Sequence, residues 1–433
     1  MNETSKRRLL VVAIALSLVP AFLLLPFPSI ISVKTVLLWL ADTIGYAGIV
    51  ILLWMYILGA KSVMSLVFSD LAPVLHIHKL LGKYGTIAIL LHPLFATLSY
   101  GEPLLYSFMP LLGTQFERHV TLGRIAFVIL LLTWVISAFL RKKMAFRPWK
   151  YLHYLAYICV PFAFLHVPDV GSNYMHHAVV KAYFFALVLT FVVFTVLRLR
   201  GLLNLDKYLY GVAGHTRIND TDYVLNLKPL TESHITPRRG QYVYLKLGYI
   251  SEDHPFSVLQ YDPNTGNLAI GYRVFGDYTN VMSRLRRGST VYVGGPHGTF
   301  MAEIDESERP IVFLTGGIGI TPFVDQIFHF DGKREQWLFA ANRSRETAVL
   351  IPEVADELGN HLINVYNTPS AKPGPQEETG YITTEMLKKY LGDDLNRYDF
   401  YLCGPPPMMK SMRTLMETTG VPSGQVRFEK FGW

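Results

Sequence analysis

Cysteine and charge are both scarce in this sequence of 433 residues. Only Cys159 and Cys403 occur, which excludes a disulfide scaffold, a cysteine-based zinc site, iron–sulfur ligation and covalent haem attachment through C-x-x-C-H. Charged residues make up 17% of the chain, below the roughly 25% of soluble domains, and hydrophobic residues make up 51%. These proportions exclude a disordered or fibrous chain.

Acidic residues are especially scarce in the first half of the chain. Residues 1–200 contain 17 Lys and Arg against 6 Asp and Glu, whereas the remaining residues contain 23 against 27. The basic half is also the apolar half. Its charge therefore indicates membrane topology and not nucleic-acid binding.

Six apolar stretches in this half are near the ~20 residues that cross a hydrocarbon core. They are Leu9–Pro28, Thr35–Leu58, Pro73–Tyr100, Thr121–Leu140, Tyr151–Pro168 and Ala178–Leu197. Lys6-Arg7-Arg8 would also suit a signal peptide, but the first run is long and has no clear small-residue cleavage site, so we expect an uncleaved span. The sequence predicts a bundle of six transmembrane helices in a lipid bilayer.

The connecting charges predict the orientation of this bundle. With six crossings, one side holds Lys6, Arg7, Arg8, Lys61, Arg141, Lys142, Lys143, Arg147, Lys150, Arg198 and Arg200. The other side has little charge besides Lys34, Glu102, Glu117, Arg118 and Asp169. By the positive-inside rule, the N-terminus and everything after residue 200 are cytoplasmic, as in a multi-pass protein of the plasma membrane.

Four histidines lie inside apolar stretches, where ionisable groups are costly and are functional candidates. His78 and His92 are 14 residues apart, and His153 and His166 are 13 apart. On a straight helix the first pair shares one face, about 21 Å apart along the axis, whereas the second pair is about 140° out of phase unless Pro161 bends the helix. Two bis-imidazole sites stacked across the membrane would suit two non-covalent, b-type haems.

Two other readings of these histidines remain open. Intramembrane histidines can simply hydrogen-bond neighbouring helices. His76 could replace His78 as a ligand, although its spacing places it about 160° out of phase with His92.

After residue 205 the pattern changes to that of a soluble protein. Short alternating runs suit a small antiparallel barrel: Tyr223–Leu227, Gln241–Leu247, Leu268–Val274 and Thr290–Val293. From residue 310, apolar strands alternate with helical stretches, as in a parallel α/β sheet: Ile311–Leu314, Gln336–Ala341, Ile363–Tyr366 and Phe400–Cys403.

The first of these parallel strands runs into a glycine-rich turn, Thr315–Phe323. Its glycines would let backbone approach a pyrophosphate, and Pro322 suits the first turn of a helix. Such a turn alone is weak evidence, but other motifs accompany it in order: His254-Pro255-Phe256-Ser257, Arg273, Gly276-Asp277-Tyr278-Thr279, Gly295–Phe300 and Cys403-Gly404-Pro405-Pro406.

These motifs resemble the transmembrane NADPH oxidase and ferric reductase family, including its prokaryotic flavocytochrome b members. The resemblance runs from about residue 40 to Trp433, and the histidine spacings of 14 and 13 also match. It implies a transmembrane di-haem domain at 1–200, an FAD-binding β-barrel at 205–305 and an NAD(P)H-binding α/β domain at 306–433. The last two would form a ferredoxin-reductase-like module.

The resemblance also implies residue roles. His254, Pro255, Phe256 and Ser257 would line the flavin, and Arg273, Gly276 and Thr279 would hold the FAD pyrophosphate. Gly316, Gly317, Gly319, Thr321 and Pro322 would bind the nicotinamide nucleotide, with Cys403, Gly404 and Pro405 beside the nicotinamide. Trp433, or else Phe431, would stack on the flavin. Ser257, Cys403 and Trp433 are thus the candidate catalytic residues. His297 departs from the aromatic residue, often Tyr, that the family has there.

Nucleotide choice has its own candidates, Arg343 and Arg345, which follow the strand Gln336–Ala341. Arginine there can bind a 2′-phosphate, so we expect NADPH to be at least as good a substrate as NADH, unless these are solvated surface arginines.

The predicted function is electron transfer from NAD(P)H through FAD and two haems to O₂, giving superoxide, or to ferric iron. No obligate protein partner is evident, although an electron-relay subunit for a partner is an alternative. A transporter with a nucleotide-sensing domain would leave the histidine pairs unexplained.

Overall fold

The computed structural model describes the chain except residues 1–2, 69, 172–176, 370–371 and 430–433. It forms two compact units, Met1–Gly201 and Leu202–Trp433, which are described separately.

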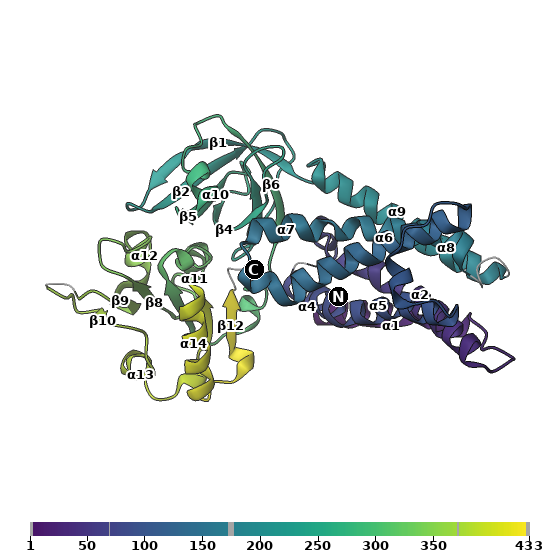
Figure 1. The fold of residues 1–433 in the computed structure, drawn as a ribbon. Coiled ribbons are helices and arrows are strands. Elements are labelled where there is room, and N and C mark those ends of the chain that lie inside the picture. Colours follow the sequence, from purple (N-terminus) through teal and green to yellow (C-terminus); the bar gives the residue numbers. More distant parts are fainter. Residues whose placement is uncertain (1–2, 69, 172–176, 370–371, 430–433) are drawn as a thin grey trace. The chain divides into compact units, whose positions relative to one another are not determined.

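The first unit is a helical bundle (Figure 1). Its longer helices are α1 (Glu3–Leu23), α2 (Val33–Leu58), α5 (Thr86–Ser99), α6 (Gln115–Val135), α8 (Ala156–Val170) and α9 (Ala178–Leu202). Shorter segments are α3 (Lys61–Met64), α4 (Ala72–Leu80), η1 (Leu81–Gly85), η2 (Leu104–Phe108), η3 (Ile136–Leu140), η4 (Arg141–Lys143) and α7 (Phe146–Tyr154). Capping boxes at Ser32 and Thr114 begin α2 and α6, because their hydroxyls accept from the backbone N–H three residues on.

Five helical segments among the described residues are long and apolar enough to cross a membrane, where the sequence predicted six. They are Val33–Leu58, Ala72–Ser99, Gln115–Lys143, Phe146–Val170 and Ala178–Leu202. The first predicted stretch is helical as α1, but Lys6, Arg7 and Arg8 occupy its early turns and shorten its apolar part. Residues 24–32 are not helical, so the helix in the predicted stretch Leu9–Pro28 ends at Leu23.

The two histidine-bearing spans are both interrupted. The third contains the π-helical segment η1 between His78 and His92. The fifth breaks at Leu155, between α7 and α8, and Pro161 lies inside α8. A proline ring clashes with the carbonyl four residues earlier, which is Tyr157 here, so Pro161 does not by itself place the break at Leu155.

The second unit begins with a closed barrel of six strands, as predicted. They are β1 (Tyr208–Arg217), β2 (Asp222–Pro229), β3 (Tyr242–Lys246), β4 (His254–Tyr261), β5 (Leu268–Arg273) and β6 (Thr290–His297). All neighbours pair antiparallel in the order β1-β2-β5-β4-β3-β6, and α10 (Asp277–Met282) follows β5. Inward-facing residues such as Tyr210, Leu225 and Ile270 are buried in the barrel core.

A parallel six-stranded sheet follows, also as predicted (Figure 1). Its strands are β7 (Ile311–Gly316), β8 (Gln336–Asn342), β9 (Leu362–Tyr366), β10 (Glu377–Thr379), β11 (Asp399–Cys403) and β12 (Val426–Glu429), in the order β10-β9-β8-β7-β11-β12. Its helices are α11 (Val324–Phe330), α12 (Ile351–Leu358), α13 (Thr384–Leu391) and α14 (Pro406–Thr418). Every residue of β7 and β11 is buried, as expected for strands covered on both faces.

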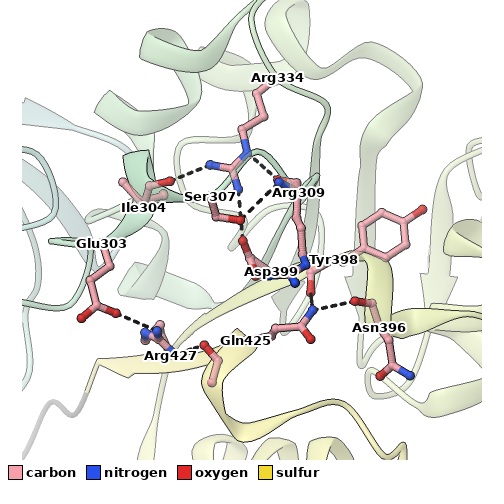
Figure 2. A network of polar contacts seen from close by, with 11 residues as sticks. Glu303, Ile304, Ser307, Arg309, Arg334, Asn396, Tyr398, Asp399, Gln425 and Arg427 are labelled. Atoms are coloured by element: carbon pink, nitrogen blue, oxygen red, sulfur yellow. Dashed lines mark hydrogen bonds and ion pairs between the residues drawn. The ribbon is translucent and has the colours of Figure 1, made fainter.

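A polar network lies at the amino-terminal ends of β11 and β12 (Figure 2). Arg334 donates to the Ile304 backbone carbonyl at 2.7 Å and to Asp399 at 3.2 Å, and both charged side chains are buried. Arg427 of β12 pairs with Glu303 at 2.8 Å. The network ties the segment after the barrel to the sheet, at the end opposite the glycine-rich turn, and its charges are paired with one another. We therefore interpret it as structural.

Candidate functional site

In the first unit, the structure brings the four predicted histidines together in two facing pairs. The ring centroids of His78 and His153 are 6.1 Å apart, and those of His92 and His166 are 6.3 Å apart. His78 comes from α4 and His92 from α5, whereas His153 and His166 come from α7 and α8. The pairing across spans is the one that the spacings of 14 and 13 suggested.

Three of these rings are oriented by hydrogen bonds at Nδ1. His78 contacts the Met55 carbonyl at 3.0 Å, and His92 contacts the Ala41 carbonyl at 2.8 Å. His153 contacts the Ser137 hydroxyl at 3.1 Å. A carbonyl partner requires the proton to be on Nδ1, so Nε2 of His78 and His92 carries a lone pair.

Glycines on neighbouring helices make room for the rings. A Cβ at Gly45 of α2 would lie 2.8 Å from Nδ1 of His92, and one at Gly123 of α6 would lie 3.2 Å from Cδ2 of His166. Gly59, after α2, would place its Cβ 3.4 Å from Cε1 of His78. Any larger residue at Gly45 would displace the ring, so the backbone of α2 is part of this site.

The facing pairs fit a metal held between two imidazoles. With metal–nitrogen bonds of about 2 Å, two rings on opposite sides of one metal ion have centroids roughly 6 Å apart. Both observed separations agree with this value. In the described ranges there is no group of three or more His, Cys, Asp or Glu that could hold a metal ion, so each facing pair supplies two imidazoles and no third protein ligand.

In the second unit, the predicted flavin-lining residues surround one aromatic side chain. The ring of His254 stacks on Tyr278 at 3.7 Å, and Phe256 lies 6.0 Å from the same ring. The Tyr278 hydroxyl donates to the Leu245 carbonyl at 2.5 Å, and burial raises the pKa of this phenol. Ser257 is buried in β4 opposite Tyr242 of β3, and Pro255 lies opposite Tyr244.

Arg273, at the end of β5, is held by a buried carboxylate. Its guanidinium makes two parallel bonds to Asp222, at 2.8 and 2.9 Å, while its side chain is still 38% exposed. Asp222 has no exposed surface. This bidentate pair fixes the fork of Arg273 and leaves part of it free to meet an anion. The Thr279 hydroxyl accepts from the Phe275 N–H at 2.7 Å and closes the turn through Gly276, whose φ is +84°.

His297 lies in the barrel between two tyrosines. Its ring centroid is 5.7 Å from that of Tyr242 and 5.2 Å from that of Tyr244. Burial, assisted by Lys207, lowers the pKa of His297 to about 4. Its Nδ1 has no hydrogen-bond partner among the described residues. The histidine is therefore a neutral member of an aromatic group.

The glycine-rich turn lies where the strand order of the sheet reverses. β7 has β8 on one side and β11 on the other, so the carboxyl ends of β7 and β11 form the switch point at which open α/β sheets bind ligands. Gly316 ends β7, and Gly317–Ile320 form a short 3₁₀ turn. The Thr321 hydroxyl donates to the Ile318 carbonyl at 3.0 Å. Pro322 lies before α11, which begins at Val324, so it is not in the first helical turn as predicted.

This turn packs against the predicted Cys403-Gly404-Pro405 segment at the end of β11. A Cβ at Gly319 would lie 2.5 Å from the Cys403 carbonyl, and one at Gly316 would lie 2.8 Å from Cδ of Pro405. Cys403 is buried, and burial raises the pKa of its thiol. A Cβ at Gly317 would be 3.2 Å from the Arg273 guanidinium, so the glycine-rich turn adjoins the end of β5.

The remaining predicted residues lie elsewhere. Arg343 and Arg345 follow β8 and are exposed, and Arg345 pairs with Glu377 of β10. Trp433 and Phe431 lie outside the described residues, so their placement over a flavin stays a prediction.

Sequence reasoning missed several residues that shape these sites. Gly45, Gly123 and Ser137 carried one usable signal, since they are small residues inside apolar helices where good helix formers are expected. Asp222 gave no such signal, because it is identified only by its contact with Arg273. Tyr278 lies in the motif Gly276–Thr279, but its stacking on His254 could not be predicted from the sequence.

Comparison with known proteins identifies both units. Residues 44–164 match the ferric reductase like transmembrane component, and residues 313–414 match the oxidoreductase NAD-binding domain. Part of the first unit is thus similar to that transmembrane component, and part of the second unit to that nucleotide-binding domain. The apolar helices and the first match indicate a membrane protein that carries an oxidoreductase nucleotide domain.

Individual relatives match part of the chain. A flavohemoprotein of Rhodopirellula baltica is 28% identical over 162 residues, which are 34% of this chain and 38% of that protein. The 2-halobenzoate 1,2-dioxygenase electron transfer component of Burkholderia cepacia is 27% identical, over 48% of this chain and 62% of its own length. The FAD/NAD-binding domain of a nitric oxide dioxygenase from Vibrio cholerae covers 53% of this chain and 100% of its own, with 20% identity and a TM-score of 0.46. The chain thus spans less than two thirds of the length of the flavohemoprotein and of the electron transfer component.

Proposed function

We propose that this chain is a transmembrane NAD(P)H oxidase. It would carry electrons from cytoplasmic NAD(P)H through FAD and two b-type haems to O₂ on the outer face of the plasma membrane, giving superoxide. The observation that carries this proposal is that four histidines face each other in two pairs, with ring centroids 6.1 and 6.3 Å apart. The same chain has a glycine-rich turn at the switch point of its parallel sheet. Bound FAD would take a hydride from nicotinamide and bound haem iron would pass single electrons, which is why both groups are needed.

The chain's own residues hold and orient these groups. The four histidines would hold the haem iron, and the Met55 and Ala41 carbonyls keep His78 and His92 in the tautomer that leaves Nε2 available. Arg273, fixed by Asp222, would meet the FAD pyrophosphate, and the stacked His254 and Tyr278 would form one wall of the flavin site. Ser257 would donate to the flavin ring.

The backbone of the Gly316–Thr321 turn would bind the pyrophosphate of the nicotinamide nucleotide. Cys403 would pack beside the nicotinamide as a neutral thiol, because burial keeps its pKa high. Arg343 and Arg345 follow the strand whose end meets the adenosine ribose in such folds, which supports NADPH as a substrate at least as good as NADH.

The choice of O₂ rests on the small number of basic residues on the proposed outer side, which are Lys34, Arg118, Arg124 and Lys181. An anionic ferric chelate would need a basic pocket, but Arg124 is buried, donates to the Met109 carbonyl at 2.5 Å and lies 4.3 Å from the Tyr106 ring centroid. His119 is paired with Asp169. O₂ is small and apolar, enters a bilayer freely and needs only a narrow path. A ferric-chelate reductase is the second candidate.

The test uses detergent-purified protein replete with FAD and haem. NADPH is added, and cytochrome c reduction that superoxide dismutase suppresses is compared with ferrous iron formed from a ferric chelate under argon. We expect the dismutase-sensitive signal to dominate. Fast anaerobic iron reduction with negligible dismutase-sensitive signal would identify a ferric reductase. Reduction of the haems with neither acceptor reduced would identify an electron-relay subunit.

A further inference from the structure

A polar cluster lies near the carboxyl end of β8. It consists of Asn342 of β8, Asn364 of β9, Glu377 of β10 and Arg345 in the loop after β8. The parallel ladder pairs Glu377 with Asn364, and Asn342 with Tyr366 two residues further along β9. Because side chains alternate along a strand, Asn342, Asn364 and Glu377 all point to the same face of the sheet.

Arg345 and Glu377 form the charged pair of this cluster. Nη2 of Arg345 donates to Oε1 of Glu377 at 2.5 Å and to the Lys372 backbone carbonyl at 3.3 Å. The side chain of Arg345 is 52% exposed, whereas that of Glu377 is 13% exposed. The arginine can therefore reach a ligand from the solvent side, but only part of its charge is free.

Three acceptors in the same cluster lack donors. Oε2 of Glu377 and Oδ1 of Asn342 and of Asn364 are buried, and in the described part of the chain nothing donates a hydrogen bond to them. Asn342 is only 8% exposed. Buried acceptors are nearly always satisfied in proteins, so this set indicates a ligand that brings O–H or N–H donors.

The adenosine ribose of a dinucleotide is such a ligand at this place. β8 is the neighbour of β7, whose end forms the pyrophosphate turn, and strands lie about 5 Å apart, so β10 is roughly 14 Å from β7. A nucleotide with its pyrophosphate at the turn extends its ribose in this direction. An acidic side chain there accepts from the 2′-hydroxyl of NADH, and an arginine binds the 2′-phosphate of NADPH. This chain has both groups, bonded to each other.

We propose that Glu377 is the residue that sets the choice between NADH and NADPH. One carboxylate oxygen would accept from the ribose hydroxyl, and the other holds Arg345. To bind, a 2′-phosphate must draw Arg345 away from Glu377, and it then lies beside a carboxylate of like charge. Both effects disfavour NADPH. Glu377 therefore weakens the preference for NADPH that the arginines alone would give. This assignment rests on the proposed oxidation of NAD(P)H and names the specificity residue of that site.

The test measures kcat/KM for both nucleotides with the full-length, detergent-solubilised protein and ferricyanide as acceptor. In Glu377→Gln, the ratio of kcat/KM for NADPH to that for NADH should rise about tenfold, mainly through KM. The substitution removes a negative charge that would repel the 2′-phosphate of NADPH. It also weakens the acceptor for the 2′-hydroxyl of NADH. Glu378→Gln is the matched control. Glu378 is the next residue of β10, faces the other side and binds Lys389 and Tyr390, so its loss should leave the ratio unchanged.

An unchanged ratio in Glu377→Gln, or an equal loss with both nucleotides, would overturn the assignment. If that variant does not fold, Arg345→Gln tests the same claim: it should lower kcat/KM for NADPH about tenfold and leave NADH within about twofold. Equal losses would again overturn it. A wild-type protein that oxidises neither nucleotide would contradict the proposed function only, and calorimetric titration with 2′,5′-ADP and with ADP would then test Glu377 by the same ratio.

Discussion

In the first unit the candidate site consists of side chains, whereas in the second it consists largely of backbone. Four imidazole rings on interrupted helices form the membrane site, and each pair draws one ring from α4 or α5 and one from α7 or α8. The nucleotide site is a turn of glycines that touches the Cys403 carbonyl and Pro405. A side-chain site tolerates a shift of its helix if the ring can follow, but a backbone site does not tolerate an added Cβ.

The largest expected effect concerns the rings themselves. Removing either member of a pair, as in His78→Ala or His166→Ala, should abolish the low-spin haem signal of that pair, since an axial ligand is lost. Reduced-minus-oxidised spectra and electron paramagnetic resonance measure this. His76→Ala should leave both signals intact. Two full haem signals in His78→Ala would remove this histidine from the site.

The glycines beside the histidine rings test the same comparison between the two units. They belong to a site that consists of side chains, but they act through the backbone, because the missing Cβ leaves room for the rings. Gly45→Ala would place Cβ 2.8 Å from Nδ1 of His92 and should break its bond to the Ala41 carbonyl. Loss of such an orienting partner costs about 10–100-fold in metal affinity, here measured as retention of the second haem during purification. Gly82→Ala, whose Cβ would meet only Met55 at 3.9 Å, is the control. Equal haem retention in both variants would contradict the packing argument.

In the second unit, the buried ion pair of Figure 2 should matter more than any surface pair. Arg334→Ala removes the nearer charge partner of the buried Asp399 and leaves only Arg309 at 3.7 Å, so we expect a loss of about 3 kcal/mol in the free energy of unfolding. Arg217→Ala breaks the exposed pair with Asp220 and should cost less than about 1 kcal/mol. Chemical denaturation compares the two. A similar small loss in both would show that the network is not structural.

A smaller effect concerns His297. Because its pKa is about 4 when folded and near 6.5 when unfolded, the unfolded chain binds a proton first as the pH falls. The free energy of unfolding should therefore decrease between about pH 6.5 and pH 4, by about 3 kcal/mol from this residue. His297→Phe should flatten that part of the pH profile in thermal-shift measurements. An unaltered profile would mean that His297 is already able to take a proton in the folded state.

The sequence predicted the membrane site better than its surroundings, for a physical reason. Histidine is so costly in a bilayer that residue type and spacing selected His78 and His92, whereas the second pair also needed the resemblance to the family's spacing of 13. Neither interruption was predicted correctly: η1 has no proline, and the break near Pro161 falls at Leu155. These breaks change helix phase, which a straight-helix calculation cannot include.

The soluble unit shows the reverse. Hydrophobic alternation located four barrel strands and four sheet strands. It missed β1, β4, which contains Pro255, and the short edge strands β10 and β12. The role of Glu377 depends on β10, so no sequence pattern could pair it with Arg345. Contacts between residues far apart in the chain decide such sites, and only the fold supplies them.

The most direct test of the account is vectorial electron transfer. Protein replete with FAD and haem is reconstituted into vesicles that enclose cytochrome c, and NADPH is added to the outside. Molecules whose soluble unit faces outward should reduce the enclosed cytochrome c, and His92→Ala should abolish this while ferricyanide outside the vesicles is still reduced. Reduction of external acceptors only, with the enclosed cytochrome c unchanged in the wild type, would contradict transmembrane electron transfer through the two histidine pairs.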